Sequence, residues 1–161
     1  MTNQETAPVI TLQVKEVDPF SALCFTTRAT LSTLSQHYGT VANNLYSEAA
    51  RLNLDITGAI QWVYTGVSGD VANEFQLDIV LPIRRPGSHS NGFSYQVLGM
   101  FRCASYSHSG DWSELNATYD VLFPEFYQRG YQNDGRIREI YTVIDLQNPT
   151  NCVTEIQIAI L

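Results

Sequence analysis

Basic residues are scarce in this chain of 161 amino acids. It has 9 Lys and Arg against 16 Asp and Glu, which gives a formal net charge of −7. Phosphate binding needs clustered cations, and the only adjacent basic pair is Arg84–Arg85, so the composition argues against a nucleic-acid surface. The same negative charge is compatible with cationic ligands or with a basic protein partner.

Cysteines are few and long apolar runs are missing. Cys24, Cys103 and Cys152 are odd in number and far apart, which predicts free thiols in a reducing compartment and no zinc or redox centre. No apolar stretch approaches the roughly 18 residues of a membrane span. Residues Met1 to Pro8 lack the basic and apolar parts of a signal peptide, so we expect a cytoplasmic protein that does not bind membranes.

Motifs for common catalytic and cofactor chemistry are also missing. The segment Gly66-Val67-Ser68-Gly69 is not a nucleophile elbow, and His37, His89 and His108 show no spacing typical of a base or of metal ligands. No glycine-rich phosphate loop follows a strand and opens a helix. We therefore expect no metal and no cofactor, and we place His89 and His108 in water. Haem ligation by a histidine stays open, although nothing favours it.

Apolar residues are abundant, at 44% of the chain, and two segments have them at helical spacing. One segment runs from Thr33 to Asn53, and the second from Trp112 to Phe126. Asp111 is placed to cap the second helix and Gly130 to end it. Pro124 lies inside this helix, so we expect it to kink the helix or to end a first short piece.

The rest of the chain is rich in aromatic and β-branched residues, which predicts strands. The expected strands are Val9–Val17, Ser21–Arg28, Ala59–Thr65, Glu74–Ile83, Phe93–Ser105, Ile137–Ile144 and Val153–Leu161. The segment from Phe93 to Ser105 is long enough to bend or to form two strands.

The order of these elements repeats. At an offset of 77 positions, Tyr64 falls on Tyr141 and Asp78 on Glu155. Chance similarity between β-rich segments is the alternative, but the offset also preserves the length of the loop between the two strands. An internal duplication therefore explains the pattern better.

This duplication predicts an α+β fold. Two βαββ repeats, related by a pseudo-twofold axis, would form an antiparallel sheet with two helices on one face and a groove where the two half-domains meet. We expect the repeats at about residues 8–86 and 92–161, after a disordered N-terminus at residues 1–7.

One carboxylate stands out among the aromatic residues. Glu139 and Tyr141 share a strand face, because side chains alternate along a strand. The offset places Trp62 and Tyr64 at the matching positions, and a twofold axis would bring all four together. Three residues on the helices would supply the walls: Tyr38, Tyr119 and Phe123.

Aromatic rings around a carboxylate form a site for an organic cation, because the ring faces and the negative charge both attract it. The alternative is that the rings are ordinary core. Glu139 would then be solvated, or would pair with Arg136 or Arg138.

The chain also resembles a known family, the GyrI-like small-molecule-binding domain of the AraC-type effector-binding or SOUL-like superfamily. The resemblance spans about residues 8–161. In the second half it rests on Tyr119-Asp120-Val121-Leu122-Phe123, Gly130-Tyr131, Arg138-Glu139-Ile140-Tyr141 and Thr154-Glu155-Ile156-Gln157-Ile158. In the first half it rests on Tyr38-Gly39, Thr57-Gly58, Tyr64-Thr65-Gly66 and Glu74-Phe75 to Leu81-Pro82-Ile83.

The resemblance implies a duplicated βαββ fold with its ligand cleft between the helices. In multidrug-sensing members a glutamate in that cleft meets lipophilic cations, and the motif places this residue at Glu139, with Tyr141 beside it. Many relatives carry a helix-turn-helix module as well. The expected elements leave no room for one here, so the resemblance implies a stand-alone domain without direct nucleic-acid binding.

Three functions follow as hypotheses. The first is binding or sensing of an amphipathic or cationic aromatic molecule, as in effector domains of bacterial transcription activators. The second is hydrolysis of an electrophilic small molecule, with Glu139 as general acid or base and Tyr141 as its proton partner. The third is interaction with a basic protein, as in the gyrase-inhibiting relatives. The sequence does not identify the ligand, the partner or the oligomeric state.

Overall fold

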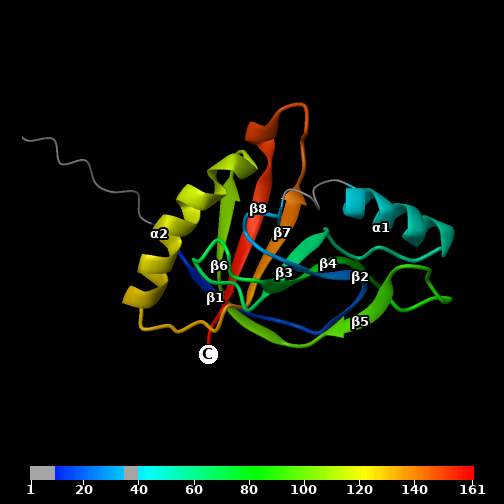
Figure 1. Ribbon diagram of the computed structural model, residues 1–161, viewed down its shortest axis with the longest axis horizontal. Helices are drawn as coiled ribbons and strands as arrows, with labels where there is room; N and C mark the ends of the chain where they lie inside the picture. The colour runs from blue at the N-terminus through cyan, green and yellow to red at the C-terminus, as the bar shows by residue number, and fades with distance from the viewer. Residues whose placement is uncertain (1–9, 35–39) are drawn as a thin grey trace, which may run out of the picture.

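Eight antiparallel strands form one sheet, and two helices cover one of its faces (Figure 1). The structure is a computed structural model that describes residues 10–34 and 40–161. The strands are β1 (Gln13–Val17), β2 (Phe20–Ala29), β3 (Gln61–Thr65), β4 (Phe75–Ile83), β5 (Ser94–Leu98), β6 (Phe101–Ser109), β7 (Ile137–Val143) and β8 (Val153–Ala159). The helices are α1 (Thr40–Arg51) and α2 (Leu115–Gln128), with short 3-10 turns η2 (Trp112–Glu114) and η3 (Pro149–Asn151).

Both predicted helices exist, but each begins later in the chain than the sequence predicts. In the described part of the first segment, residues 31–33 form a turn and α1 begins at Thr40. The Asp111 carboxylate accepts from the Ser113 N–H and so caps η2, which leads into α2. Helix α2 continues through Pro124, so this residue does not end the helix. Gly130 ends it, with a φ of 83° and an N–H that donates to the Tyr127 carbonyl.

The strand pairing confirms the duplication. Trp62 pairs with Ile79 in the β3–β4 hairpin, and Glu139 pairs with Ile156 in the β7–β8 hairpin, so the two hairpins have the same register at the offset of 77. Trp62 and Glu139 are also direct partners where β3 meets β7. Because the offset relates these two residues to each other, the pseudo-twofold axis passes between them at the centre of the sheet.

The outer strands are exchanged between the two halves. The sheet order is β1-β6-β8-β7-β3-β4-β2-β5. The first strand of the chain, β1, therefore lies beside β6 of the second half, and β5 lies beside β2 of the first half. The segment from Phe93 to Ser105 thus contributes two strands, as the sequence allowed, and the second of them extends to Ser109.

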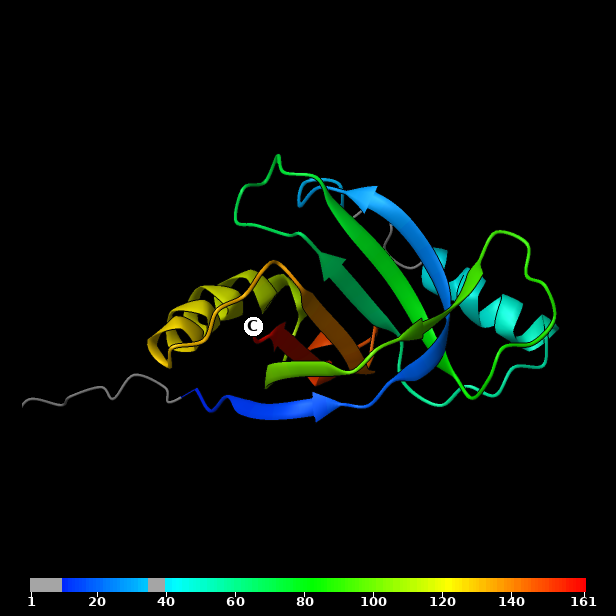
Figure 2. The same ribbon diagram turned by 90° about the horizontal axis from the view of Figure 1, so that it is seen from below.

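The sheet curls away from the helices. In Figure 2 the helices lie at opposite ends of the molecule, and β1 and β5 bend around the opposite face of the sheet. The curl brings side chains of distant strands together on that face. The guanidinium carbon of Arg138 in β7 lies 3.9 Å from the ring centre of Phe101 in β6 and 5.9 Å from that of Phe20 in β2.

The main core lies between the sheet and the helices. Leu45 of α1 and Leu122 of α2 are fully buried and occupy matching positions at the offset of 77. They pack into one apolar cluster with alternate residues of the strands, such as Leu77 and Ile156. Smaller apolar clusters lie on the curled face. In the described part of the chain, no helix combines the length and the apolar character needed to cross a membrane.

Three smaller expectations have different outcomes. The three cysteines are buried free thiols, as expected. His89 is exposed, but the placement of His108 in water was wrong. Strand β6 is longer than expected and α2 folds back over its end, so His108 is buried and its Nδ1 lies 2.9 Å from the Thr118 hydroxyl. The expectation for residues 1–7 lies outside the described residues.

Candidate functional site

Glu139 lies at the centre of the sheet, on the face that carries the helices. It is in β7, paired with Trp62 of β3, and only 5% of its surface is exposed. Its neighbours Arg138 and Ile140 point to the opposite face, because strand side chains alternate. A carboxylate buried this deeply needs hydrogen-bond partners, since an ionised group loses its hydration there.

Three tyrosine hydroxyls provide these partners. Tyr64 of β3 donates to Glu139 Oε1 at 2.9 Å, and Tyr141 of β7 donates to the same oxygen at 2.7 Å. Tyr119 of α2 donates to Oε2 at 2.6 Å. Both carboxylate oxygens are therefore bonded, by residues from two strands and one helix.

The partners of this carboxylate are neutral. Among the described residues, no lysine or arginine lies within ion-pair distance of Glu139; Arg136 instead bonds to Asp134 at 2.9 Å. The structure thus contradicts the alternatives in which Glu139 is solvated or paired with Arg136 or Arg138. Burial, together with the nearby Glu139 carboxylate, raises the pKa of Tyr119 and of Tyr141 well above the ordinary value, so both remain hydroxyl donors at neutral pH.

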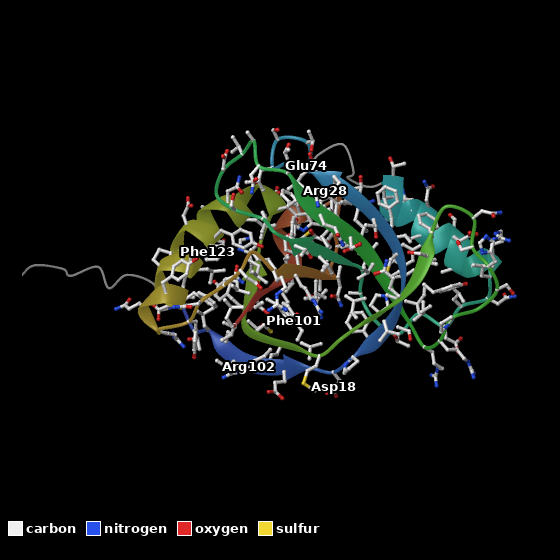
Figure 3. All side chains as sticks on the ribbon, turned by 60° about the horizontal axis from the view of Figure 1, so that its bottom comes forward. Asp18, Arg28, Glu74, Phe101, Arg102 and Phe123 are labelled. Atoms are coloured by element: carbon white, nitrogen blue, oxygen red, sulfur yellow. The ribbon has the colours of Figure 1, made fainter. Side chains whose placement is uncertain are left out.

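Aromatic rings surround the carboxylate. The Tyr141 ring makes edge contacts with Trp62, at 6.3 Å between centres, and with Trp112 of η2, at 5.6 Å. Tyr119 stacks on Phe123, one turn further along α2, at 6.0 Å. Figure 3 shows Phe123 on the α2 ribbon. Rings of this kind offer π faces and edges as well as apolar surface.

The structure brings six of the seven residues predicted for the site into one cluster. They are Trp62, Tyr64, Tyr119, Phe123, Glu139 and Tyr141. Tyr38 lies outside the described residues. Sequence reasoning missed Trp112 as a site residue. It was assigned to the apolar stripe of the second helix, and no signal in the sequence indicated its contact with Tyr141.

The protein therefore belongs to the class of α+β domains, with a buried carboxylate that three tyrosines bind between the sheet and α2. Comparison with protein families gives this class a name. The chain matches the GyrI-like small molecule binding domain over residues 11–161, and it belongs to that family. Among curated proteins, no sequence matches it.

Solved structures share this fold at low sequence identity. The C-terminal domain of EcmrR has a TM-score of 0.78 at 16% identity, and the match covers 96% of this chain and 99% of that one. SAV2435, in a structure described as bound to tetraphenylphosphonium, has a TM-score of 0.66 at 13% identity, with 94% of each chain covered. A protein from Listeria innocua described as a hydrolase has a TM-score of 0.66 at 13% identity, with 96% and 94% covered.

Proposed function

We propose that this protein binds amphipathic aromatic cations at a site above Glu139, between the two helices, and acts as a sensor of such molecules. The observation that carries the proposal is a buried carboxylate whose described partners are all neutral hydroxyls. This centre has a negative charge and no permanent counter-ion among the described residues, so a ligand cation would supply the missing charge.

The surroundings favour an aromatic cation over a small hydrated one. A lipophilic cation has little hydration to lose when it enters an apolar site, and it gains contact with the ring faces. Trp62, Trp112 and Phe123 offer rings on two sides of the carboxylate. An anion would be repelled by Glu139, and a neutral ligand would leave its charge uncompensated.

The likeness to SAV2435 suggests a probe. That protein is described as bound to tetraphenylphosphonium, although at 13% identity the likeness itself concerns the fold. Tetraphenylborate has nearly the same shape and the opposite charge, so the two ions together separate charge recognition from hydrophobic contact.

The experiment is a thermal-unfolding titration with both ions. A ligand at about 100 times its Kd stabilises the folded state by about 2.7 kcal/mol, which raises the Tm of a chain of this size by roughly 5–11 °C. We expect that rise with tetraphenylphosphonium for the wild type and for the control Glu16→Gln, which removes an exposed carboxylate on β1. We expect none for Glu139→Gln.

Two results would contradict the proposal. One is an equal rise for Glu139→Gln. The other is an equal rise with tetraphenylborate, which would mean that the site selects shape and not charge.

Hydrolysis is the second candidate function. It is favoured by the contact between Tyr141 and Glu139, because a carboxylate 2.7 Å from a hydroxyl can take a proton from an attacking water while the tyrosine protonates the departing oxygen. A suitable test is turnover of 4-nitrophenyl acetate and styrene oxide. Loss of turnover in both Glu139→Gln and Tyr141→Phe would support this function. Binding of the cation with no turnover of either compound would exclude these two reactions.

A further inference from the structure

Arg138 is buried on the face of the sheet away from the helices. Only 6% of its surface is exposed, and its guanidinium lies over the Phe101 ring at 3.9 Å. Figure 3 shows Phe101 toward the middle of the molecule, inside the curve that β1, β5 and β2 make. Arg138 is therefore held within the concave side of the sheet.

This guanidinium has no counter-ion in the described part of the chain. No carboxylate there lies within ion-pair distance of it, and its Nε and Nη1 atoms are buried without a hydrogen-bond partner. Burial lowers the pKa of Arg138 to about 10, so the group still carries its charge at neutral pH. The side-chain oxygens of Gln61 and Gln157, on the same face, are also buried without partners. Such groups are rare in folded proteins and call for an explanation.

A hollow of about 290 Å³ opens beside Arg138. Its apolar wall includes Val63 of β3, Val80 of β4, and the segment Leu98 to Phe101 that joins β5 to β6. Its polar lining includes Thr65, Asp78, Gln96 and Arg136. The hollow therefore has a buried cation on one side and apolar surface on the other.

We propose that this hollow is a second ligand site, for a small amphipathic monocarboxylate. The carboxylate would pair with the Arg138 guanidinium, and the apolar part would lie against Val63, Val80 and Leu98. A carboxylate matches a guanidinium in charge and in hydrogen-bond geometry. It would supply the counter-ion that the chain's described residues do not.

Asp78 restricts the ligand to one negative charge. Val63 is the register partner of both Arg138 and Asp78, so the two charged residues lie in one row across three strands. Asp78 accepts hydrogen bonds from Thr26 and from Gln76, which hold its carboxylate in place on this face. A phosphate dianion would meet repulsion from it, and no helix N-terminus is among the lining residues to compensate.

This site is separate from the one above Glu139. Glu139 and Arg138 are adjacent in β7 and point to opposite faces, so the sheet itself lies between the two ligands. The second site does not depend on the proposed function, and the two proposals can fail independently.

The test begins with the wild-type protein and NMR of its methyl groups. The probe is 3-phenylpropionate, and the matched neutral compound is 3-phenylpropan-1-ol. We expect 3-phenylpropionate to shift the methyl signals of Val63, Val80 and Leu98, with at least tenfold weaker binding of the alcohol. The signals of Leu45 and Leu122, on the helix side, should not move. No shift at millimolar probe, equal binding of the alcohol, or shifts confined to the helix side would overturn the proposal.

A substitution provides the second arm. Arg138→Met keeps an unbranched side chain and removes a buried charge, so we expect a Tm equal to or above that of the wild type. We expect binding of 3-phenylpropionate to fall at least tenfold, while Glu139→Gln and the exposed control Arg102→Met retain it. Unchanged binding by Arg138→Met would overturn the proposal. If this variant fails to fold, the NMR titration of the wild-type protein still tests the proposal.

Discussion

The hydrogen bonds from three tyrosine hydroxyls to Glu139 should each contribute measurably to the stability of the fold. Changing Tyr64, Tyr119 or Tyr141 to phenylalanine removes one donor to the buried carboxylate and leaves the ring in place. A hydrogen bond to a charged group contributes about 1.5–3 kcal/mol to the free energy of unfolding. Each single variant should therefore lose about that amount, which lowers the Tm of a chain of this size by roughly 3–12 °C.

The same substitutions should act in the opposite direction on a bound cation. With two donors instead of three, the carboxylate is less well compensated in the free protein, so it gains more when a cation arrives. We expect tetraphenylphosphonium to stabilise Tyr141→Phe at least as much as it stabilises the wild type. A loss of stability combined with undiminished cation binding distinguishes a role in holding the carboxylate from direct recognition of the ligand.

The assay is chemical denaturation of each single variant and of its combination with Glu139→Gln. In the Glu139→Gln background the acceptor is neutral, so the cost of each tyrosine substitution should fall to about 0.5–1.5 kcal/mol. Tyr127→Phe is the control, because Tyr127 is 55% exposed and should change stability by less than about 0.5 kcal/mol. If each tyrosine substitution costs the same with Glu139 present and absent, the hydroxyls do not stabilise this carboxylate.

Three further predictions concern the scaffold. Leu45→Ala, in the fully buried contact of α1 with the sheet, should cost about 2–5 kcal/mol in denaturant unfolding; a cost below 1 kcal/mol would mean that α1 does not pack as described. Gly66 and Gly135 both have positive φ, so a change to alanine at either position should lower the free energy of unfolding by about 1–2 kcal/mol. At Gly135 the new Cβ would also lie 2.8 Å from the Val67 backbone oxygen, whereas at Gly66 it would meet nothing. Gly135→Ala should therefore have the lower Tm, and equal values would refute the contact. A hydrogen bond from Arg51 is the main cause that lowers the pKa of Glu48 from an ordinary 4.5 to about 2. The contribution of the ionised Glu48 to the free energy of unfolding is therefore complete above pH 4.5 and is lost as the pH falls toward 2. Glu48→Gln should flatten the fall in Tm over that range, and an unchanged pH profile would contradict this.

Much of the fold was predictable because both of its signals, side-chain alternation and an internal repeat, can be read directly from the order of the residues. Alternation along the strand placed Glu139 and Tyr141 on one face, and the offset of 77 related that strand to the one with Trp62 and Tyr64. Side-chain alternation needs no knowledge of the rest of the molecule. The central part of the site therefore follows from the sequence.

The remaining features depend on contacts that local patterns do not encode. Alternation places Arg138 on the far face, but only the curl of the sheet brings its guanidinium over Phe101. Trp112 reaches the site because a 3-10 turn precedes α2, and the apolar stripe alone does not distinguish that turn from helix. The burial of His108 likewise follows from the length of β6 and from the return of α2 over its end.

The exchange of β1 and β5 has a consequence for how the chain becomes a folded protein. Neither half carries a partner for its own first strand, so that strand stays unpaired until the other half is present. A break in the loop between β4 and β5 would leave each fragment with an open sheet edge, and open edges recruit other strands. The two fragments should complement each other when mixed, and each alone should tend to pair with a second copy of itself. The duplicated architecture thus behaves as two interlocked pieces and not as two modules joined in series.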